Sequence, residues 1–372
     1  MIPKRNCAGN DCSLLGFGCM RLPLTQERTI DLPRAEKMID IAYASGINYF
    51  DTAYFYLNSQ SEPFVGHAMK KYPRHTFHLA TKLPPGQVKT KADAQRILED
   101  QLKKLQTDYI DYYLLHALNA DSWKRMLEVD ILPVLVDFKR QGLIRKIGFS
   151  FHDEYPVFES ILTAFPWDFC QIQFNYMDTE VQAGLRGLQL AESRGIPVVV
   201  MEPIRGGGLV HYPDDIKQAF AELNPRRNLA NWALSYVASY DNVKVLLSGM
   251  STVGQLRDNL RTFRHFQPLS REEMQGVGEI VTKIRQKMQN ACTGCRYCMP
   301  CPAGVNIPRA FQIWNESAMH GNAEVYRKNY LAGKPASYAS SCRECGACEP
   351  QCPQQISIIE DLKKVKALFE NT

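Results

Sequence analysis

The sequence predicts an α/β fold in which a (β/α)8 barrel is followed by a small, mainly helical domain. Short apolar, β-branched or aromatic runs recur about every 30 residues, helix-like stretches separate them, and eight cysteines crowd into the last third of the chain. Alternating strands and helices indicate either a doubly wound sheet or a barrel, and the count of eight evenly spaced strands favours the barrel. We place the two domains at residues 1–285 and 286–372.

The strands and helices can be assigned in order along the chain. The predicted strands are Leu14–Gly18, Ile47–Asp51, Phe77–Lys82, Ile110–His116, Ile144–Ser150, Cys170–Asn175, Pro197–Glu202 and Val243–Gly249. Apolar side chains at three- and four-residue spacing predict helices between them, at Pro33–Ser45, Lys91–Leu105, Met126–Arg140, Glu180–Arg194 and Arg227–Ser239. Gly46, Gly142 and Gly195 stand just past helix ends, where a C-cap glycine is expected.

Length and composition narrow the function classes. The 372 residues leave room for one large and one small domain. A net charge of +5 is too small to indicate nucleic acid as a partner. No run reaches the roughly 18 consecutive apolar residues of a membrane helix, and no apolar stretch follows the first charges, so we expect a cytoplasmic protein without a signal peptide. Cys7, Cys12, Cys19 and Cys170 are expected to be free thiols, with Cys170 in the core.

Four polar residues lie at or just after the ends of three predicted strands. Asp51 ends the second strand and Tyr56 follows it, Lys82 ends the third and His116 ends the fourth. In a (β/α)8 barrel the chemistry lies at the carboxyl ends of the strands and in the loops after them. A lone Lys or His at such a place is usually solvated or structural, but four correlated placements predict one site at the barrel mouth.

This set of residues suits the reduction of a carbonyl group. A carbonyl that receives hydride becomes an alkoxide and needs a proton, and a tyrosine of pKa about 10 is a poor donor at neutral pH. A nearby lysine ammonium favours the phenolate and lowers that pKa. Tyr56 would then be the proton donor, Asp51 would orient Lys82, and His116 would hydrogen-bond the substrate oxygen.

Two cysteine runs, each closed by Cys-Pro, predict two [4Fe–4S] clusters. Because the fourth ligand of such a run usually serves the other cluster, one cluster is assigned to Cys292, Cys295, Cys298 and Cys352, and the other to Cys342, Cys345, Cys348 and Cys301. The alternatives are disulfides and zinc sites.

Helices are expected beside the runs at Ile307–Met319, Ala323–Leu331 and Ile356–Phe369, with Phe311, Trp314, Tyr326 and Tyr330 facing inward in a separate small core.

The ordered motifs resemble those of the aldo-keto reductase superfamily. The matching segments are Asp-x-Ala-x-x-Tyr at Asp51–Tyr56, Thr-Lys at Thr81–Lys82 and Leu-His at Leu115–His116. The resemblance covers about residues 14–265 and implies a TIM barrel with a catalytic tetrad of Asp51, Tyr56, Lys82 and His116. The whole chain is similar to the subgroup that carries a C-terminal, ferredoxin-like domain with two [4Fe–4S] clusters.

The resemblance also implies a cofactor, NADP(H), with NAD as an alternative. Phe151 stands where the superfamily has an Asn that holds the nicotinamide carboxamide. The residues that the resemblance assigns to the cofactor are Met20, Arg21, Ser150, Gln173, Met201, Ser251, Gln255 and Asn259.

Taken together, these features predict an NAD(P)H-dependent oxidoreductase that reduces a small aldehyde, ketone or quinone-like carbonyl substrate. The alternative is a non-catalytic, nucleotide-binding redox sensor or electron-transfer module. Hydride transfer moves two electrons at once whereas a [4Fe–4S] cluster passes one, so the clusters would exchange electrons with a redox partner protein, serve as structure, or work through a bound flavin.

Overall fold

The computed structural model describes residues 2–371, which form two compact units. The first, here called unit 1, comprises residues 2–206 and 230–270. The second, unit 2, comprises residues 207–229 and 271–371. The domain boundary expected between residues 285 and 286 stays a prediction.

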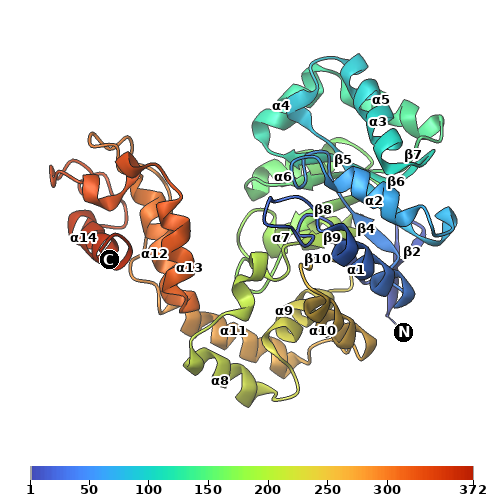
Figure 1. The fold of residues 1–372 in the computed structure, drawn as a ribbon. Coiled ribbons are helices and arrows are strands. Elements are labelled where there is room, and N and C mark those ends of the chain that lie inside the picture. Colours follow the sequence, from blue (N-terminus) through green and yellow to red (C-terminus); the bar gives the residue numbers. More distant parts are fainter. Residues whose placement is uncertain (1, 372) are drawn as a thin grey trace. The chain divides into compact units, whose positions relative to one another are not determined.

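Unit 1 contains a closed barrel of parallel strands, which confirms the predicted fold class (Figure 1). The strands follow one another around the barrel in chain order, and β10 closes it by pairing with β3, Leu246 opposite Leu15. The barrel strands are β3 (Leu15–Gly18), β4 (Tyr49–Asp51), β5 (His78–Leu83), β6 (Ile110–Leu118), β7 (Ile144–Phe151), β8 (Phe169–Gln173), β9 (Val198–Met201) and β10 (Val243–Gly249). Every strand end lies within two residues of its predicted position.

Helices alternate with these strands along the chain. They are α1 (Leu32–Ala44), α2 (Ser61–Met69), α3 (Lys91–Leu105), α4 (Ala120–Glu128), α5 (Ile131–Arg140), α6 (Tyr155–Ala164), α7 (Gly184–Ser193), α9 (Leu229–Ala238) and α10 (Val253–Arg264). The single helix predicted over Met126–Arg140 is wrong: Asp130 has a left-handed backbone with φ of 54°, which ends α4 and starts α5. The predicted C-cap glycines are confirmed, because Gly46, Gly142 and Gly195 all have positive φ.

An antiparallel hairpin, which the sequence did not predict, precedes the barrel. Its strands are β1 (Lys4–Cys7) and β2 (Asn10–Ser13). Cys7 and Cys12 of the hairpin are buried in one cluster with Tyr49, Tyr112 and Phe169, which stand near the starts of their barrel strands. The hairpin therefore covers the amino-terminal end of the barrel, opposite the end where the strands carry their functional residues.

Unit 2 has a hydrophobic core of its own, as expected. Its helices are α8 (Asp214–Leu223), α11 (Arg271–Arg285), α12 (Ile307–His320), α13 (Ala323–Leu331) and α14 (Ile358–Phe369). Phe311, Trp314 and Tyr330 are buried in this core and Tyr326 packs against it, which confirms the predicted inward face. Six of the cysteines of the two runs also pack against it, and the segments that carry the runs contain neither α-helix nor strand.

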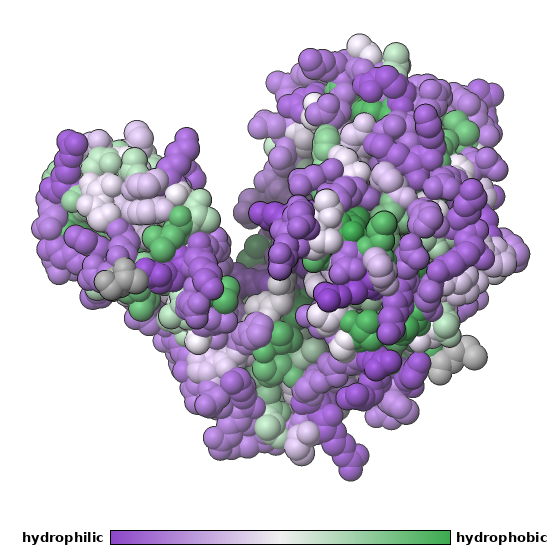
Figure 2. Space-filling view, in the orientation of Figure 1, coloured by the Kyte–Doolittle hydropathy of each residue, from purple (hydrophilic) through white to green (hydrophobic). Residues whose placement is uncertain are grey.

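Hydrophilic side chains predominate on the face of the molecule shown in Figure 2, over both units. Among the described residues, no helix is long and apolar enough to cross a membrane.

Candidate functional site

A buried ion pair lies at the carboxyl end of the barrel strands. Asp51 ends β4 and Lys82 lies near the end of β5, the neighbouring strand. The Lys82 Nζ atom donates to both carboxylate oxygens of Asp51, at 2.7 and 2.8 Å, and to the carbonyl oxygen of Thr52 at 2.7 Å. Both side chains are buried. Burial raises the pKa of Asp51, and the ammonium of Lys82 acts in the opposite direction.

Tyr56 and His116 complete the group that the sequence predicted. The Lys82 Nζ atom lies 4.8 Å from the centre of the Tyr56 ring, and the rings of Tyr56 and His116 meet edge to face with centroids 5.9 Å apart. The expected lowering of the pKa of Tyr56 is wrong: burial raises this pKa and outweighs the ammonium of Lys82, which acts in the expected direction. Burial, together with the charge on Lys82, lowers the pKa of His116 to about 3. At neutral pH, then, Tyr56 holds its proton and His116 is an uncharged imidazole.

Left-handed backbone follows two of these four residues. Directly after Tyr56, three consecutive residues have positive φ: Leu57 at 53°, Asn58 at 55° and Ser59 at 65°. Directly after His116, Ala117 has φ of 49°. Each such residue costs of order 1–3 kcal/mol, and strain of this kind gathers where a fold has to hold side chains in set positions. The backbone is therefore strained where Tyr56 and His116 are held.

Buried hydrogen bonds that sequence reasoning missed support the loop before α2. The hydroxyl of Thr52 donates to that of Ser61 at 2.8 Å, and Ser61 donates to the carbonyl of Cys19 at 3.0 Å. This chain of bonds ties the residue after Asp51 to the start of α2 and to the end of β3. The one available signal was the position of Thr52 next to Asp51, since a bond to a backbone carbonyl leaves no pattern in the sequence.

A second buried group lies beside Lys82. The Glu62 carboxylate accepts from the hydroxyl of Thr81 at 2.6 Å and from Gln101 Nε2 at 2.7 Å. Gln101 Nε2 also lies 3.0 Å from the carbonyl oxygen of Lys82. Burial raises the pKa of Glu62, against these two hydrogen bonds. These bonds fix the backbone on both sides of the Lys82 side chain.

Several of the residues assigned to the cofactor lie together around the amino-terminal end of α10. The Ser251 hydroxyl donates to the carbonyl of Arg21 at 2.8 Å, and the Gln255 side chain accepts from the Ser251 amide at 2.8 Å. Asn259 is buried and donates to the Ser248 hydroxyl at 2.8 Å. Met20 and Arg21 are exposed beside them. Exposed groups beside a helix amino terminus fit the phosphate end of a dinucleotide.

The three residues assigned to the nicotinamide end have partners within the protein. The Ser150 hydroxyl accepts from the amide of Ala117 at 2.7 Å. The Met201 sulfur lies 3.6 Å from Gln171 Nε2. Gln173 donates to Asp178 at 3.0 Å and accepts from Gln182 at 2.9 Å. One bond at each end fixes the orientation of this amide and leaves it one N–H and one lone pair to offer a carboxamide.

Four cysteines from the two runs line one pocket in unit 2. Cys292, Cys295 and Cys298 come from the first run and Cys352 from the second, together with apolar side chains that include Phe311. Burial raises the pKa of Cys292, and the neighbouring thiols of Cys295 and Cys352 add to this rise. The four thiols are those assigned to the first cluster from the spacing of the sequence.

The second assigned set also brings the two runs together. Burial raises the pKa of Cys348 to about 11, and the neighbouring groups that add to this rise include Cys342 of the same run and Cys301 of the other. All twelve cysteines are free of disulfides. In residues 2–371, no three Cys, His, Asp or Glu side chains converge closely enough to hold one metal ion. Thiols that share a pocket without meeting at one point fit a cluster bound at its four corners.

Two family models match the chain. Residues 14–282 match the sequence model described as the aldo/keto reductase family, and residues 291–357 match that of a 4Fe-4S dicluster domain. The uncharacterized oxidoreductase YqkF of Bacillus subtilis is 26% identical over 303 residues, which cover 72% of this chain and 92% of that protein. The L-galactose dehydrogenase of Arabidopsis thaliana is 25% identical, over 71% of this chain and 88% of its own.

Solved structures show the same barrel. The holo form of the aldo-keto reductase AKR11C1 from Bacillus halodurans aligns with a TM-score of 0.65 and 28% identity, covering 75% of this chain and 96% of that one. The thermostable aldo-keto reductase Tm1743 aligns with a TM-score of 0.62 at 24% identity, a likeness that bears on the fold alone.

Proposed function

The chain belongs to the aldo/keto reductase family and carries a 4Fe-4S domain at its C-terminal end, and from this premise we propose that it reduces the carbonyl group of a small aldehyde, ketone or quinone-like substrate with NADPH. The observation that carries the proposal is the ammonium of Lys82, which lies between the carboxylate of Asp51 and the ring of Tyr56 in a buried site. An ammonium held there is fixed in charge and in place. It stabilises negative charge that develops at Tyr56.

Each of the four residues has one task in this proposal. Tyr56 gives its phenolic proton to the carbonyl oxygen as negative charge develops there. Lys82 stabilises the phenolate that remains, and Asp51 keeps Lys82 charged and oriented. His116, uncharged because its pKa is about 3, orients the carbonyl oxygen by a hydrogen bond and does not compete as an acid. The chemistry that a bound nicotinamide supplies is the hydride.

The dinucleotide would be held by the residues around α10 and by the ends of three strands. Ser251, Gln255 and Asn259, with Met20 and Arg21 beside them, suit its adenosine phosphate end, and Ser150, Gln173 and Met201 suit its nicotinamide end. NAD is the alternative cofactor. Because Gln173 bonds both Asp178 and Gln182, its amide would be already oriented when its remaining N–H and lone pair meet the cofactor.

The cysteine runs would hold two [4Fe–4S] clusters with the ligand sets assigned from the sequence. Cys352 of the second run shares one pocket with three cysteines of the first, and Cys301 of the first run acts on the pKa of Cys348 in the second, which supports one ligand of each cluster coming from the other run. The clusters would exchange single electrons with a redox partner protein or hold unit 2 together. A bound flavin would be needed to link them to a hydride donor directly.

A second candidate function is a nucleotide-binding redox sensor without turnover. The two bonds of Gln173 favour it, because they leave only one N–H and one lone pair of this amide to hold a nicotinamide.

The test is NADPH oxidation by the anaerobically purified, cluster-containing protein with a panel of aldehydes and quinones. Tyr56→Phe is expected to lower kcat by about 10²–10⁴-fold, the usual contribution of a positioned acid. Tyr54→Phe, the same change two residues away, is the matched control and is expected to leave the rate unchanged. Equal activity in wild type and Tyr56→Phe would refute the proposed role of Tyr56, and no turnover of any substrate by wild type would favour the sensor.

A further inference from the structure

Two buried thiols lie together at the amino-terminal end of the barrel, far along the strands from the residues discussed above. In the hairpin, Arg5 pairs with Cys12 and Cys7 with Asn10. Cys7 and Cys12 are thus diagonal neighbours on the same face of the hairpin, and each thiol shifts the pKa of the other. Both are fully buried against the barrel interior. Neither is used by the proposed reductase chemistry.

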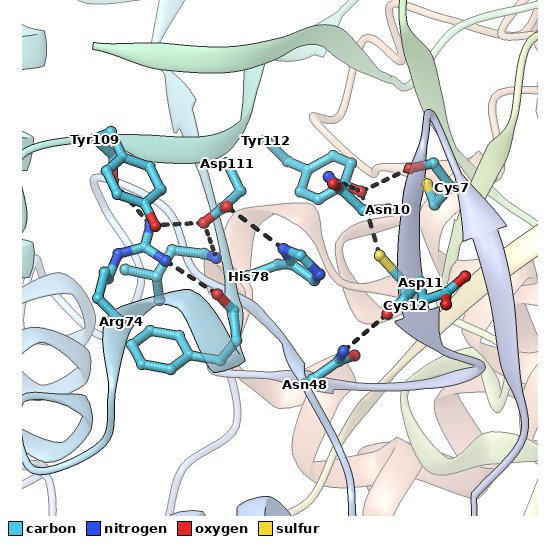
Figure 3. Close-up of polar contacts among 12 residues, drawn as sticks. Cys7, Asn10, Asp11, Cys12, Asn48, Arg74, His78, Tyr109, Asp111 and Tyr112 are labelled. Atoms are coloured by element: carbon cyan, nitrogen blue, oxygen red, sulfur yellow. Dashed lines mark hydrogen bonds and ion pairs between the residues drawn. The ribbon is translucent and has the colours of Figure 1, made fainter. Parts of the chain in front are cut away.

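Tyr112 of β6 links the two cysteines. Its hydroxyl donates to the carbonyl of Cys7 at 2.8 Å and lies 3.2 Å from the sulfur of Cys12 (Figure 3). Asn10 of the hairpin turn donates to the same hydroxyl at 3.0 Å. A hydroxyl that bonds both the carbonyl and the sulfur can turn its proton toward the sulfur when Cys12 loses its own proton. Cys12 therefore has a hydrogen-bond donor ready for a thiolate.

A connected group of three side chains, His78, Asp111 and Arg74, lies on the other side of Tyr112. The His78 Nδ1 atom lies 3.4 Å from Asp111, whose carboxylate accepts from Arg74 at 2.6 Å and from the amide of Leu79 at 2.9 Å (Figure 3). The pKa of His78 is raised, because the hydrogen bond to Asp111 outweighs the opposite effect of burial. The neighbouring Cys7 side chain lowers the pKa of Cys12, burial opposes this, and the charge of His78 lowers it further. Cys170, buried alone in β8, has only burial acting on it, which raises its pKa.

We propose that Cys7 and Cys12 form a reversible dithiol–disulfide pair, in which Cys12 is the nucleophile and Cys7 the second thiol, oxidised by a low-molecular-weight disulfide. Three features distinguish this pair from two structural cysteines: a thiol partner, a hydroxyl donor to the sulfur and an imidazole oriented by a carboxylate. The same features activate nucleophilic cysteines in general. The inference does not depend on the reductase function proposed above.

The chemistry balances as two thiol–disulfide exchanges. The Cys12 thiolate attacks one sulfur of the disulfide, a Cys12–S bond forms, the original S–S bond breaks and a thiolate leaves. Cys7 then attacks the Cys12 sulfur and the second thiolate leaves. Two electrons pass from the cysteine pair to the disulfide, and the two cysteine protons end on the two released thiols.

The hairpin accounts for reversibility and for access. Diagonal positions across an antiparallel pair are separated by about 7–8 Å, whereas a relaxed disulfide needs Cα atoms within about 7 Å. Bridging the pair therefore shifts the two strands, and a strained disulfide is reduced easily. Two strands of four residues each form a unit small enough to open locally, so a reagent reaches the thiols when the hairpin separates from the barrel.

The test equilibrates the full-length, cluster-containing protein anaerobically with mixtures of glutathione and glutathione disulfide. After acid quenching, alkylation and trypsin digestion, residues 6–21 form one peptide with Cys7, Cys12 and Cys19, so the buried Cys19 is an internal control. Under oxidising mixtures we expect this peptide to lose two hydrogens and to carry a single label, on Cys19. The bridged fraction should rise and fall reversibly with the glutathione ratio. Three labels at every ratio, or a bridge to Cys19, would overturn the proposal.

Single substitutions of the two cysteines show which thiol attacks first. Cys7→Ser should stop at one glutathione attached to Cys12, and Cys12→Ser should give neither the bridge nor glutathione on Cys7. Cys170→Ser is the matched control and should leave the bridge unchanged. Attack at Cys7 in the Cys12→Ser protein would overturn the assigned roles, and the wild-type peptide decides the bridge itself should a variant fail to fold.

Discussion

At the scale of single residues, Lys82 and Asp51 depend on each other for their burial. Both side chains are inside the barrel, and the two bonds to the Asp51 carboxylate, together with the bond to the Thr52 carbonyl, use the three hydrogen atoms of the ammonium. A buried charge that loses its partner costs several kcal/mol, whereas removal of both charges costs much less.

The first prediction follows from this pairing. Lys82→Met alone should lower the free energy of unfolding of the barrel by about 3–5 kcal/mol, because it leaves Asp51 buried and unpaired. The double variant Lys82→Met/Asp51→Leu should recover most of this loss while remaining inactive. Urea denaturation followed by circular dichroism measures both. Additive losses in the double variant would show that the two charges do not stabilise each other.

The second prediction concerns pH. Burial raises the pKa of Tyr56, so the proton donor is fully protonated at neutral pH and is lost only as pH rises through that raised value, above about 10. His116, with a pKa of about 3, does not titrate at working pH. The pH profile of kcat for carbonyl reduction should therefore be flat from about pH 6 to 9. A loss of rate centred near pH 6.5 would mean that a histidine is the acid.

The sequence located the four residues of the ion-pair site because each follows a strand end, and strand ends of a barrel converge. It did not reveal that Gln173 is already engaged at both ends. One of these bonds runs from Gln182, nine residues further along the chain, and such a pairing produces no periodic pattern. The roles of the assigned cofactor residues stay predictions.

At the scale of elements, α2 packs closely against α3 at a glycine that leaves room for the α3 backbone. A Cβ atom on Gly66 would lie 2.2 Å from the backbone carbonyl oxygen of Lys104, in the last turn of α3. That carbonyl belongs to the backbone and cannot move aside. Since α2 starts directly after the loop that carries Tyr56, the close contact sets where this loop is held.

The third prediction contrasts two helical glycines. Gly66→Ala should cost at least about 2 kcal/mol, because the helices have to separate. Gly278→Ala in α11 meets nothing within 4 Å and should gain up to about 1 kcal/mol from helix propensity. Thermal unfolding of each variant gives the comparison. A neutral Gly66→Ala would show that α2 moves freely against α3.

The sequence predicted those elements in which apolar residues recur with a clear period, and it missed features without such a period. The strands and helix α3 matched because apolar spacing dictates them. The break between α4 and α5 was missed because it depends on the backbone of Asp130, a residue that tolerates left-handed conformation without requiring it. The hairpin was missed because β1 and β2 are mostly polar and short.

At the scale of the whole molecule, the two cysteine runs lie in segments without helix or strand, at the edge of a small core. Little besides the proposed clusters would fix these segments. The barrel, in contrast, is closed by backbone hydrogen bonds between all of its strands.

The fourth prediction is that iron removal loosens unit 2 selectively. After anaerobic chelation, trypsin should cut after Arg296 and Arg343, which are exposed and lie inside the two runs. Arg145, equally exposed but held in β7, should stay uncut with and without iron and serves as the control. Mass spectrometry of the fragments identifies the sites of cleavage. The same digestion pattern in both states would show that the runs are held without metal.

The closure of the barrel also has a consequence for synthesis. Strand β3 pairs with β10, about 230 residues later in the chain. At about 5–20 residues per second, a ribosome needs roughly 12–46 seconds to make the intervening segment. Throughout that interval one edge of β3 has no permanent partner, and an unpaired edge can join the wrong strand. Translation speed and chaperone capacity should therefore influence the yield of folded protein.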